Sequence, residues 1–203
     1  QNGYIAQIAW GAIGYTPAAN YGVKLARQAF ETENRRTISI SGDAAFAQSV
    51  NAIGTIAELG LDSIIFVADN RVYGIEQWLV NAEIYESSDD RTIAEKFLPM
   101  CQVPQGHIWN YSKLAAAFGG VGYVAHTNND LELILRRLVG NAADPINLSC
   151  KGSADESNAI RWEHGVPITN RNASAEEKPT FVLIAVQVVP DQLPSNLVWK
   201  AST

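Results

Sequence analysis

The sequence contains little that is typical of secreted, membrane-spanning or nucleic-acid-binding proteins. Only two of its 203 residues are cysteine, and Cys101 and Cys150 form no CxxC pair, so both are predicted to be reduced thiols rather than part of a disulfide framework. The longest apolar runs, Ser63–Ala68 and Thr180–Val189, have the length of strands and fall short of the roughly 20 residues that a membrane-spanning helix needs. Lys and Arg number 15 against 21 Asp and Glu, a net charge of −6 with no basic stripe, so nucleic acid is not expected as a partner.

The chain is long and apolar enough to bury a sizeable core. Hydrophobic residues make up 47% of it, which is sufficient for one large domain or two small ones. No signal-peptide pattern is apparent, and together with the reduced cysteines this predicts a cytoplasmic protein. The first residue is Gln1 rather than Met, so we expect a processed chain or a part of a longer one.

Helical and strand-like patterns alternate along the first two-thirds of the chain. Apolar periodicity predicts helices over residues 15–30, 47–59, 75–84, 92–98, 111–118 and 129–139. Short apolar and β-branched runs predict strands over residues 37–40, 64–68, 122–125 and 181–188. This alternation is typical of a three-layer α/β/α fold with a mainly parallel sheet. Polar stretches around 81–106 and 141–178 are interpreted as insertions in a single domain, residues 1–203.

Ligands of such sheets bind beyond the carboxyl ends of the strands, so the loops 41–46 and 69–76 are the places to search. In the first loop, Gly42 allows a sharp turn and close backbone approach, and the following helix start offers N–H groups to a phosphate. Asp43 adds a carboxylate, which together with a diphosphate would suit Mg²⁺. Taken alone, the dipeptide is better explained as a turn with a helix N-cap.

The second loop contains Asp69-Asn70. Asn70 lies 27 positions after Asp43. If the two strands are adjacent and parallel, Asp43 and Asn70 lie side by side at one edge of the sheet. The amide oxygen of Asn70 and the backbone carbonyl of Val72 could then complete the oxygen ligands of Mg²⁺. Alone, this loop is also better explained as a turn held by an Asx hydrogen bond. The spacing of the pair favours the metal site.

With this spacing the sequence resembles the thiamine diphosphate motif, in which GDG is followed after about 24–27 residues by NN or DN. The surrounding sequence resembles the pyruvate and indolepyruvate decarboxylases. The resemblance implies a thiamine diphosphate-binding fold, with thiamine diphosphate and Mg²⁺ as cofactors. The segments that carry it are 10–14, 42–45, 60–67 and 70–76, with weaker matches at 109–111, 118–119 and 181–188.

The resemblance also implies roles for individual residues. Asp43, Asn70 and the Val72 carbonyl correspond to the metal ligands. Gly11 corresponds to the residue whose carbonyl bonds the 4′-amino group of the cofactor. Ile13 corresponds to the apolar wedge that holds the cofactor bent, although without the resemblance it would be interpreted as a core residue. The other positions expected to contact the cofactor are Ala12, Gly42, Ala44, Ala45, Tyr73, Gly74 and Ile75.

Glu76 carries the predicted chemistry. In decarboxylases of this kind a glutamate at this position lies near the substrate carboxylate, and a carboxylate in an apolar site can relay a proton after CO₂ is lost. The alternative is an exposed glutamate at a helix start, where the helix dipole favours it. Ile75 is expected to line the substrate pocket.

The sequence departs from the family pattern at several positions. The third glycine of the motif is Ala44, and Ala45 replaces a residue that is often Ser or Thr, so a hydroxyl for the diphosphate is missing. Asp69 stands where the family often has Asn, and Arg71-Val72 replace the usual small residue. The segment after the predicted catalytic glutamate is longer than in simple decarboxylases, so a bulky or aromatic 2-oxo acid is expected as the substrate rather than pyruvate.

The second half of the expected active site is absent from the sequence. The family uses a second glutamate from a pyrimidine-binding domain, which precedes this domain and usually acts across a subunit interface, so a partner domain and a homo-oligomer (dimer or tetramer) are expected. His107, His126 and His164 are scattered and are not predicted to be catalytic. Three interpretations remain open: a decarboxylase component, a carboligase that joins two 2-oxo acids as acetolactate synthase-like enzymes do, and a non-catalytic domain that retains the fold.

Overall fold

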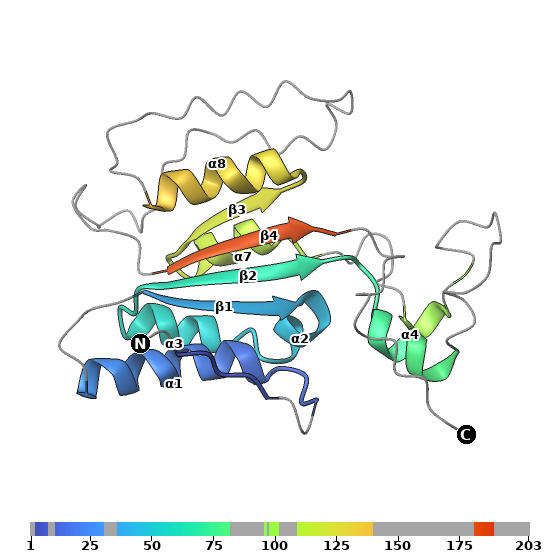
Figure 1. Ribbon diagram of the computed structural model, residues 1–203, viewed down its shortest axis with the longest axis horizontal. Coiled ribbons are helices and arrows are strands. Elements are labelled where there is room, and N and C mark those ends of the chain that lie inside the picture. The colour runs from blue at the N-terminus through green and yellow to red at the C-terminus, as the bar shows by residue number, and fades with distance from the viewer. Residues whose placement is uncertain are drawn as a thin grey trace.

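The computed structural model describes residues 3–7, 11–30, 36–81, 96, 98–101, 109–139 and 181–188. These residues contain a four-stranded sheet in which every neighbouring pair of strands is parallel (Figure 1). The strands follow the order β1-β2-β4-β3 across the sheet. Their bounds are β1 Thr37–Gly42, β2 Ser63–Asp69, β3 Val121–Ala125 and β4 Phe181–Gln187.

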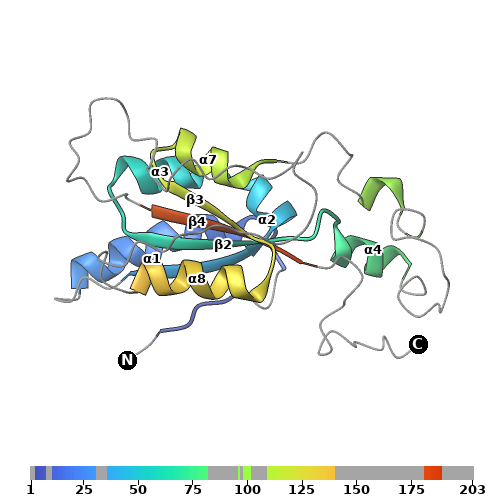
Figure 2. The same ribbon diagram turned by 90° about the horizontal axis from the view of Figure 1, so that it is seen from above.

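Helices cover both faces of this sheet, as predicted for a three-layer α/β/α fold. Figure 2 shows α3 and α7 on one face and α8 on the other. Helix α1 packs on β1 and α3, while α4 and the 3₁₀ turn η1 contact each other, and Figure 1 shows α4 beyond the carboxyl ends of the strands. The helix bounds are α1 Tyr15–Phe30, α2 Asp43–Gln48, α3 Ala52–Glu58, α4 Gly74–Val80, η1 Pro99–Cys101, α7 Tyr111–Ala117 and α8 Asn128–Val139.

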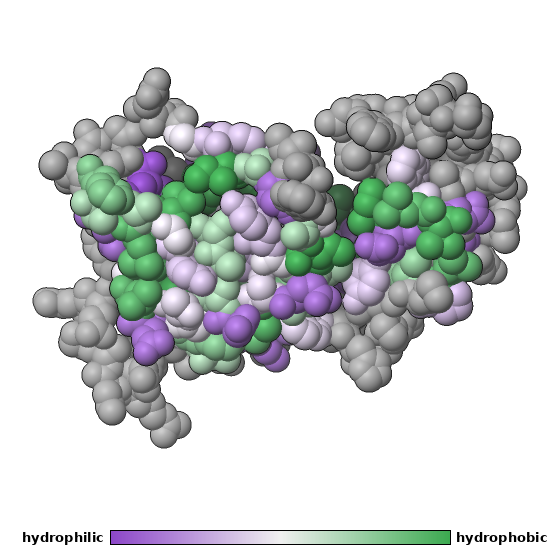
Figure 3. Space-filling view, turned by 90° about the horizontal axis from the view of Figure 1, so that it is seen from below, coloured by the Kyte–Doolittle hydropathy of each residue, from purple (hydrophilic) through white to green (hydrophobic). Residues whose placement is uncertain are grey.

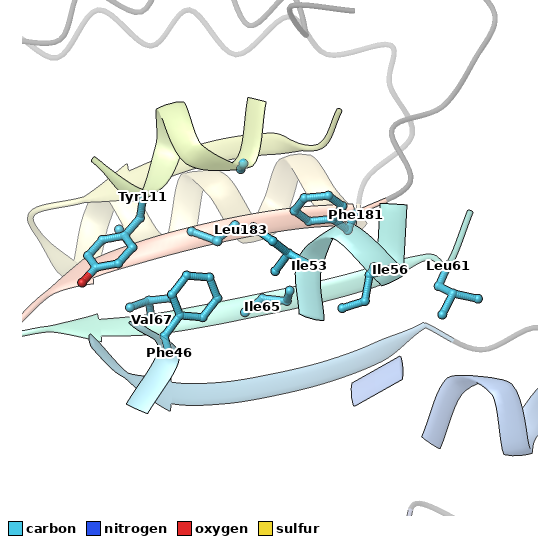
Figure 4. Close-up of a cluster of buried hydrophobic side chains, with 11 residues drawn as sticks. Phe46, Ile53, Ile56, Leu61, Ile65, Val67, Tyr111, Phe181 and Leu183 are labelled. Atoms are coloured by element: carbon cyan, nitrogen blue, oxygen red, sulfur yellow. The ribbon is translucent and has the colours of Figure 1, made fainter. Parts of the chain in front are cut away.

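Two hydrophobic clusters fill the space between the sheet and the helices. The cluster under α2, α3 and α7 includes Phe46, Ile65 and Phe181, none of which is measurably exposed (Figure 4). The cluster on the α8 face includes Ile134 and Ile184. Each such side chain contributes roughly 1.5–3 kcal/mol when fully buried. Strand β2 supplies both clusters, which explains why its sequence is a nearly continuous apolar run.

Edge strand β1 buries its polar side chains and exposes its isoleucines, the reverse of an ordinary half-buried strand. Its polar residues Thr37, Ser39 and Ser41 are buried on the α1 side. On the other face Ile38 is 62% exposed and Ile40 is 70% exposed. In the part of the chain that the structure describes, no helix covers these two isoleucines.

Two predicted helices differ from the structure. The helix predicted over 47–59 is divided into α2 and α3, because Ser49 leaves the helix and its hydroxyl donates to the carbonyl of Gly14 over 2.7 Å. The helix predicted over 75–84 ends at Val80, where Asn81 takes an extended conformation. Gly60 ends α3 with a φ of 62°, as predicted for a residue just past a helix.

Most of the two predicted insertions, 81–106 and 141–178, lies outside the described residues, as does Cys150. Cys101 is a buried free thiol. None of the helices in the described ranges is long and apolar enough to span a membrane.

Candidate functional site

The loops after β1 and β2 lie next to each other, as the sequence predicts. The two strands are adjacent and parallel, and Gly42 at the end of β1 is paired with Ala68 near the end of β2. Asp43 and Asp69, which follow these positions, are only 5% and 4% exposed. Two buried carboxyl groups therefore sit at the carboxyl edge of the sheet, where ligands of parallel sheets bind.

Asp43 is held by backbone N–H groups from both loops. Its Oδ1 accepts a hydrogen bond from Ala44 N at 2.7 Å, and its Oδ2 accepts one from Arg71 N at 2.9 Å. Burial nevertheless raises the pKa of Asp43 to about 6, because the desolvation of its charge outweighs these two bonds, and the carboxylate of Asp69 adds to the rise. A carboxylate in this state gains from a cation that would restore the solvation it has lost.

The turn after β2 contains an Asx hydrogen bond, which was the alternative to a metal-binding role for Asn70. Oδ1 of Asn70 accepts from Val72 N at 3.2 Å. Between them, Arg71 has a φ of 61°, a left-handed conformation that costs a non-glycine residue roughly 1–2 kcal/mol. The turn directs the Arg71 N–H toward Asp43. An amide oxygen has a second lone pair, so the turn does not exclude Asn70 as a ligand.

The end of β4 is tied to the same turn. The amide nitrogen of Gln187 donates to Oδ2 of Asp69 at 2.5 Å, and its amide oxygen accepts from Arg71 Nη2 at 3.0 Å. The next residue, Val188, donates its N–H to the carbonyl of Asp69 at 3.0 Å. Three strand ends, those of β1, β2 and β4, are thus joined by hydrogen bonds at one place.

Gly42 does not provide the sharp turn that was expected of it. Its φ of −71° and ψ of 159° are ordinary extended values, so a sharp turn does not require glycine here. A Cβ at this position would meet nothing within 4 Å, so open space lies beside the backbone. Helix α2 begins at the next residue, Asp43, four positions before the helix start predicted at residue 47.

Residues 11–14 precede α1 and include the first positions predicted to contact the cofactor. They lie against the break between α2 and α3. Gly11 has a φ of 56°, and Ala12 donates its N–H to Oε1 of Gln7 at 2.9 Å. Ile13 is 46% exposed, so it is not the core residue that was the alternative interpretation. The Gly14 carbonyl accepts from the Ser49 hydroxyl, which fixes this segment beside the first site loop.

Residues 73–76 form the start of α4. Tyr73 donates its N–H to the carbonyl of Cys101 at 2.7 Å, and Gly74 is the first helical residue. Ile75 is 45% exposed, while Glu76 is half-buried in the first turn. The base of this helix is fixed by Gln77, which is fully buried and accepts from Leu98 N at 2.8 Å.

Sequence reasoning missed two residues of the site. One is Gln187. The other is Tyr111 at the start of α7, whose ring packs edge to face on Phe46 with centroids 5.7 Å apart and whose hydroxyl points toward the carboxyl ends of the strands (Figure 4). Burial, with the nearby carboxylates of Asp43 and Asp69, raises the pKa of the Tyr111 phenol. Tyr111 lies in one of the weaker matching segments, which was the available signal.

The described residues suit an ion bound through mixed oxygen ligands rather than a cage of side chains. Among them, no three His, Cys, Asp or Glu side chains gather as a metal-binding group. The edge of the sheet offers the carboxylate of Asp43, the amide oxygen of Asn70 and backbone carbonyls, beside the carboxylate of Asp69, whose Oδ2 accepts from Gln187. Such an incomplete oxygen set fits a hard cation that brings phosphate oxygens and water with it. His126 is exposed, and His107 and His164 lie outside the described residues.

Several known proteins are similar in sequence to part of this chain. A pyruvate decarboxylase of Aspergillus fumigatus is 32% identical over 131 residues, which are 63% of this chain and 20% of that protein. A thiamine metabolism regulatory protein of Saccharomyces cerevisiae is 30% identical over 124 residues, 59% of this chain and 18% of that protein. An alpha-keto-acid decarboxylase of Mycobacterium tuberculosis is 30% identical over 122 residues, 60% of this chain and 18% of that protein.

The chain therefore spans about a fifth of the length of these relatives or slightly less. Residues 1–148 match the family described as thiamine pyrophosphate enzyme, C-terminal TPP binding domain. Thiamine pyrophosphate is thiamine diphosphate, so the resemblance and the cofactor predicted from the sequence are both confirmed. The chain belongs to the C-terminal, thiamine diphosphate-binding domain family of thiamine-dependent enzymes.

Proposed function

We propose that this domain binds thiamine diphosphate through a Mg²⁺ ion at the carboxyl ends of β1 and β2. The carboxylate of Asp43 supports this proposal, since it is only 5% exposed at the carboxyl edge of the sheet and accepts a hydrogen bond from the backbone of Arg71, next to Asn70. Asn70 and the carbonyl of Val72 would add two more oxygens, and the diphosphate and water would complete the usual six. Open space beside Gly42 would admit the diphosphate to the backbone of Ala44 and Ala45.

The thiamine ring, when bound, supplies an electron sink for breaking the bond next to a carbonyl carbon. The residues of this chain orient that ring and manage protons. Gly11 would accept a hydrogen bond from the 4′-amino group, and the half-exposed Ile13 would press on the cofactor from the apolar side. Glu76 would hold or deliver a proton near the substrate carboxylate, with Ile75 beside it in the substrate pocket.

The reaction we propose is decarboxylation of a 2-oxo acid that is bulky or aromatic. Two of the relatives named above are decarboxylases, one for pyruvate and one for alpha-keto acids. Glu76 and Ile75 at the start of α4 supply the carboxylate and the apolar surface that such a substrate needs. The long segment after α4 is the reason for proposing a larger substrate than pyruvate.

The complete enzyme is proposed to need a second, pyrimidine-binding domain and a homo-oligomer. Figure 3 shows hydrophobic residues gathered over α4, where Ile75, Leu79 and Val80 are 45%, 65% and 61% exposed. Apolar surface of this kind next to a site marks a face that another domain or subunit covers. The site face of this chain would thus be completed by a partner domain that carries the second catalytic glutamate.

Isothermal titration with Mg²⁺ and thiamine diphosphate tests the proposal, using the chain combined with its pyrimidine-binding half. The expected result is binding that depends on both ligands and that Asp43→Ala abolishes. The absence of heat in the wild-type protein, or equal heat in Asp43→Ala, would overturn the proposed grip. Product analysis with two different 2-oxo acids then separates decarboxylation from carboligation, because only the first yields an aldehyde alone.

A non-catalytic role is the second candidate, and one observation favours it. One relative, 30% identical to this chain, is named a thiamine metabolism regulatory protein. A similar sequence therefore also occurs in a protein that is named for regulation rather than for catalysis. Ala44 and Ala45, which replace the usual glycine and hydroxyl residue, are compatible with that role. Cofactor binding without turnover of any 2-oxo acid would favour a cofactor sensor over an enzyme.

A further inference from the structure

The end of β4 contains a side chain with no role in the motif of the family. Gln187 is half-buried at the last position of the strand. Its amide nitrogen donates to the buried carboxylate of Asp69, and its amide oxygen accepts from the guanidinium of Arg71. Only one orientation of the amide satisfies both neighbours, because a carboxylate accepts and a guanidinium only donates. These contacts span 118 and 116 positions of sequence, respectively.

The two residues held by Gln187 flank Asn70, the proposed metal ligand. Asp69 is the last residue of β2, and Arg71 follows Asn70 in a left-handed conformation with a φ of 61°. A non-glycine residue keeps this conformation only where its surroundings enforce it. The Arg71 side chain is bonded to Gln187 and its backbone N–H to Oδ2 of Asp43, so the residue is fixed at both ends.

From this arrangement we infer that Gln187 is a positioning residue for the cation site. By bridging Asp69 and Arg71 it fixes the turn that contains Asn70, and through the Arg71 N–H it fixes the Asp43 carboxylate in the direction needed for a cation. The inference rests on the proposed function only for the identity of the ligand. The two hydrogen bonds by which Gln187 joins Asp69 and Arg71, called the clamp below, are present in the chain without cofactor.

The clamp also accounts for an arginine in a turn where the family usually has a small residue. Glycine would adopt the left-handed conformation without strain but would have no side chain to reach β4. Arg71 adopts the strained left-handed conformation, and its side chain contacts Gln187 on β4. In this chain the turn is therefore specified by a long-range contact instead of by glycine.

Amide hydrogen exchange of the 203-residue chain without cofactor tests the clamp directly. Gln187→Leu keeps the bulk of the side chain and removes both bonds, while Val186→Ala on the same strand removes apolar packing on the α8 face and serves as the control. In Gln187→Leu the amide of residue 71 is expected to exchange at least tenfold faster, relative to the amide of Ile65 in the centre of β2. In Val186→Ala the two amides should change together.

Arg71→Ala and the double variant Arg71→Ala/Gln187→Leu complete the test. If Gln187 acts through Arg71, the double variant exchanges at residue 71 no faster than the faster single variant. An unchanged ratio of residue 71 to Ile65 in Gln187→Leu would overturn the inference, and so would fully additive effects. If Gln187→Leu does not fold, Gln187→Glu, which keeps the acceptor for Arg71 but repels Asp69, takes its place and is expected to raise the same ratio.

Binding of Mg²⁺ and thiamine diphosphate gives a second measurement that separates the two proposals. Affinity is expected to fall about tenfold in Gln187→Leu and to stay near the wild-type value in Val186→Ala. If wild-type protein binds neither ligand, the proposed function fails, and the exchange ratios still decide whether the clamp exists. If wild-type and Gln187→Leu bind equally well, the clamp does not position the cation site.

Discussion

The backbone N–H of Arg71 donates to Oδ2 of Asp43 over 2.9 Å and joins two loops that are 28 positions apart in sequence. This bond holds a carboxylate whose burial raises its pKa to about 6. The arrangement keeps the carboxylate oriented in the absence of a cation, at a cost to stability. The first prediction follows from that cost.

Stability of the cofactor-free chain should depend on pH through Asp43. The folded-state pKa is raised from an ordinary value near 3.8 to about 6, so the contribution of the protonated group is fully present below pH 4 and is lost as the pH rises through 6. Between pH 4 and pH 7 the wild-type protein should lose up to about 3 kcal/mol relative to Asp43→Asn. Chemical denaturation of both proteins at each pH measures the difference, and parallel curves would contradict the prediction.

The same carboxylate should make cofactor binding sensitive to acid. A cation and a proton compete for Asp43, so affinity for Mg²⁺ and thiamine diphosphate should fall up to about tenfold for each pH unit below 6. Titration of the chain with its pyrimidine-binding half at pH 5, 6 and 7 measures this slope. A flat profile below pH 6 would mean that Asp43 does not contact the cation.

Glu76→Gln should separate binding from chemistry. The substitution keeps the size of the side chain in the first turn of α4 and removes its proton, so cofactor affinity should change less than about threefold while decarboxylation slows by about 10²–10⁴-fold. Rates of the assembled enzyme with an aromatic 2-oxo acid measure the second effect. Retention of full activity would show that Glu76 is only a helix-start glutamate.

Tyr111→Phe should affect the site more than the fold. Phenylalanine keeps the edge-to-face contact with Phe46, so the free energy of unfolding should change by less than about 1 kcal/mol, whereas Tyr111→Ala should cost about 3–5 kcal/mol. Because the hydroxyl points toward the carboxyl ends of the strands and the phenol is influenced by the charges of Asp43 and Asp69, its loss should weaken cofactor binding several-fold. Equal affinity in Tyr111→Phe and wild type would exclude the hydroxyl from the site.

Substitution of Gly122, where α7 packs closely on β3, can be compared with substitution of Gly22, which lies in open space on α1. A Cβ at Gly122 would lie 2.2 Å from the carbonyl oxygen of Ser112, which is backbone and cannot move aside, so Gly122→Ala should destabilise by about 3 kcal/mol or more. A Cβ at Gly22 in α1 meets nothing within 4 Å, and Gly22→Ala should stabilise by up to about 1 kcal/mol. Thermal unfolding of the two variants should move in opposite directions.

The exposed face of β1 should promote association. Ile38 and Ile40 lie on an edge strand and are 62% and 70% exposed. Replacing both with Thr keeps the β-branched shape and removes apolar surface, so self-association should weaken while the stability of the monomer changes little. Light scattering over a range of concentrations measures this. An unchanged mass would show that Ile38 and Ile40 take no part in self-association.

The sequence alone predicted the alternation of helices and strands and the proximity of the two loops that contain Asp43 and Asn70. Continuous apolar runs predict strands such as β2 that are buried on both faces, and strands buried in this way belong to parallel sheets. Parallel strands end at one edge, so the loops with Asp43 and Asn70 had to be neighbours once β1 and β2 were adjacent. This inference needed only local patterns and the rules of sheet topology.

Only the tertiary structure decided which residues secure that site. Gln187 is 118 positions from Asp69, and no local pattern links an ordinary glutamine at a strand end with an aspartate on another strand. The break between α2 and α3 depends on the contact of Ser49 with Gly14, while helical periodicity continues through it. Periodicity reports which face of an element is apolar, but hydrogen bonds between distant segments form only after the sheet has brought the strand ends together.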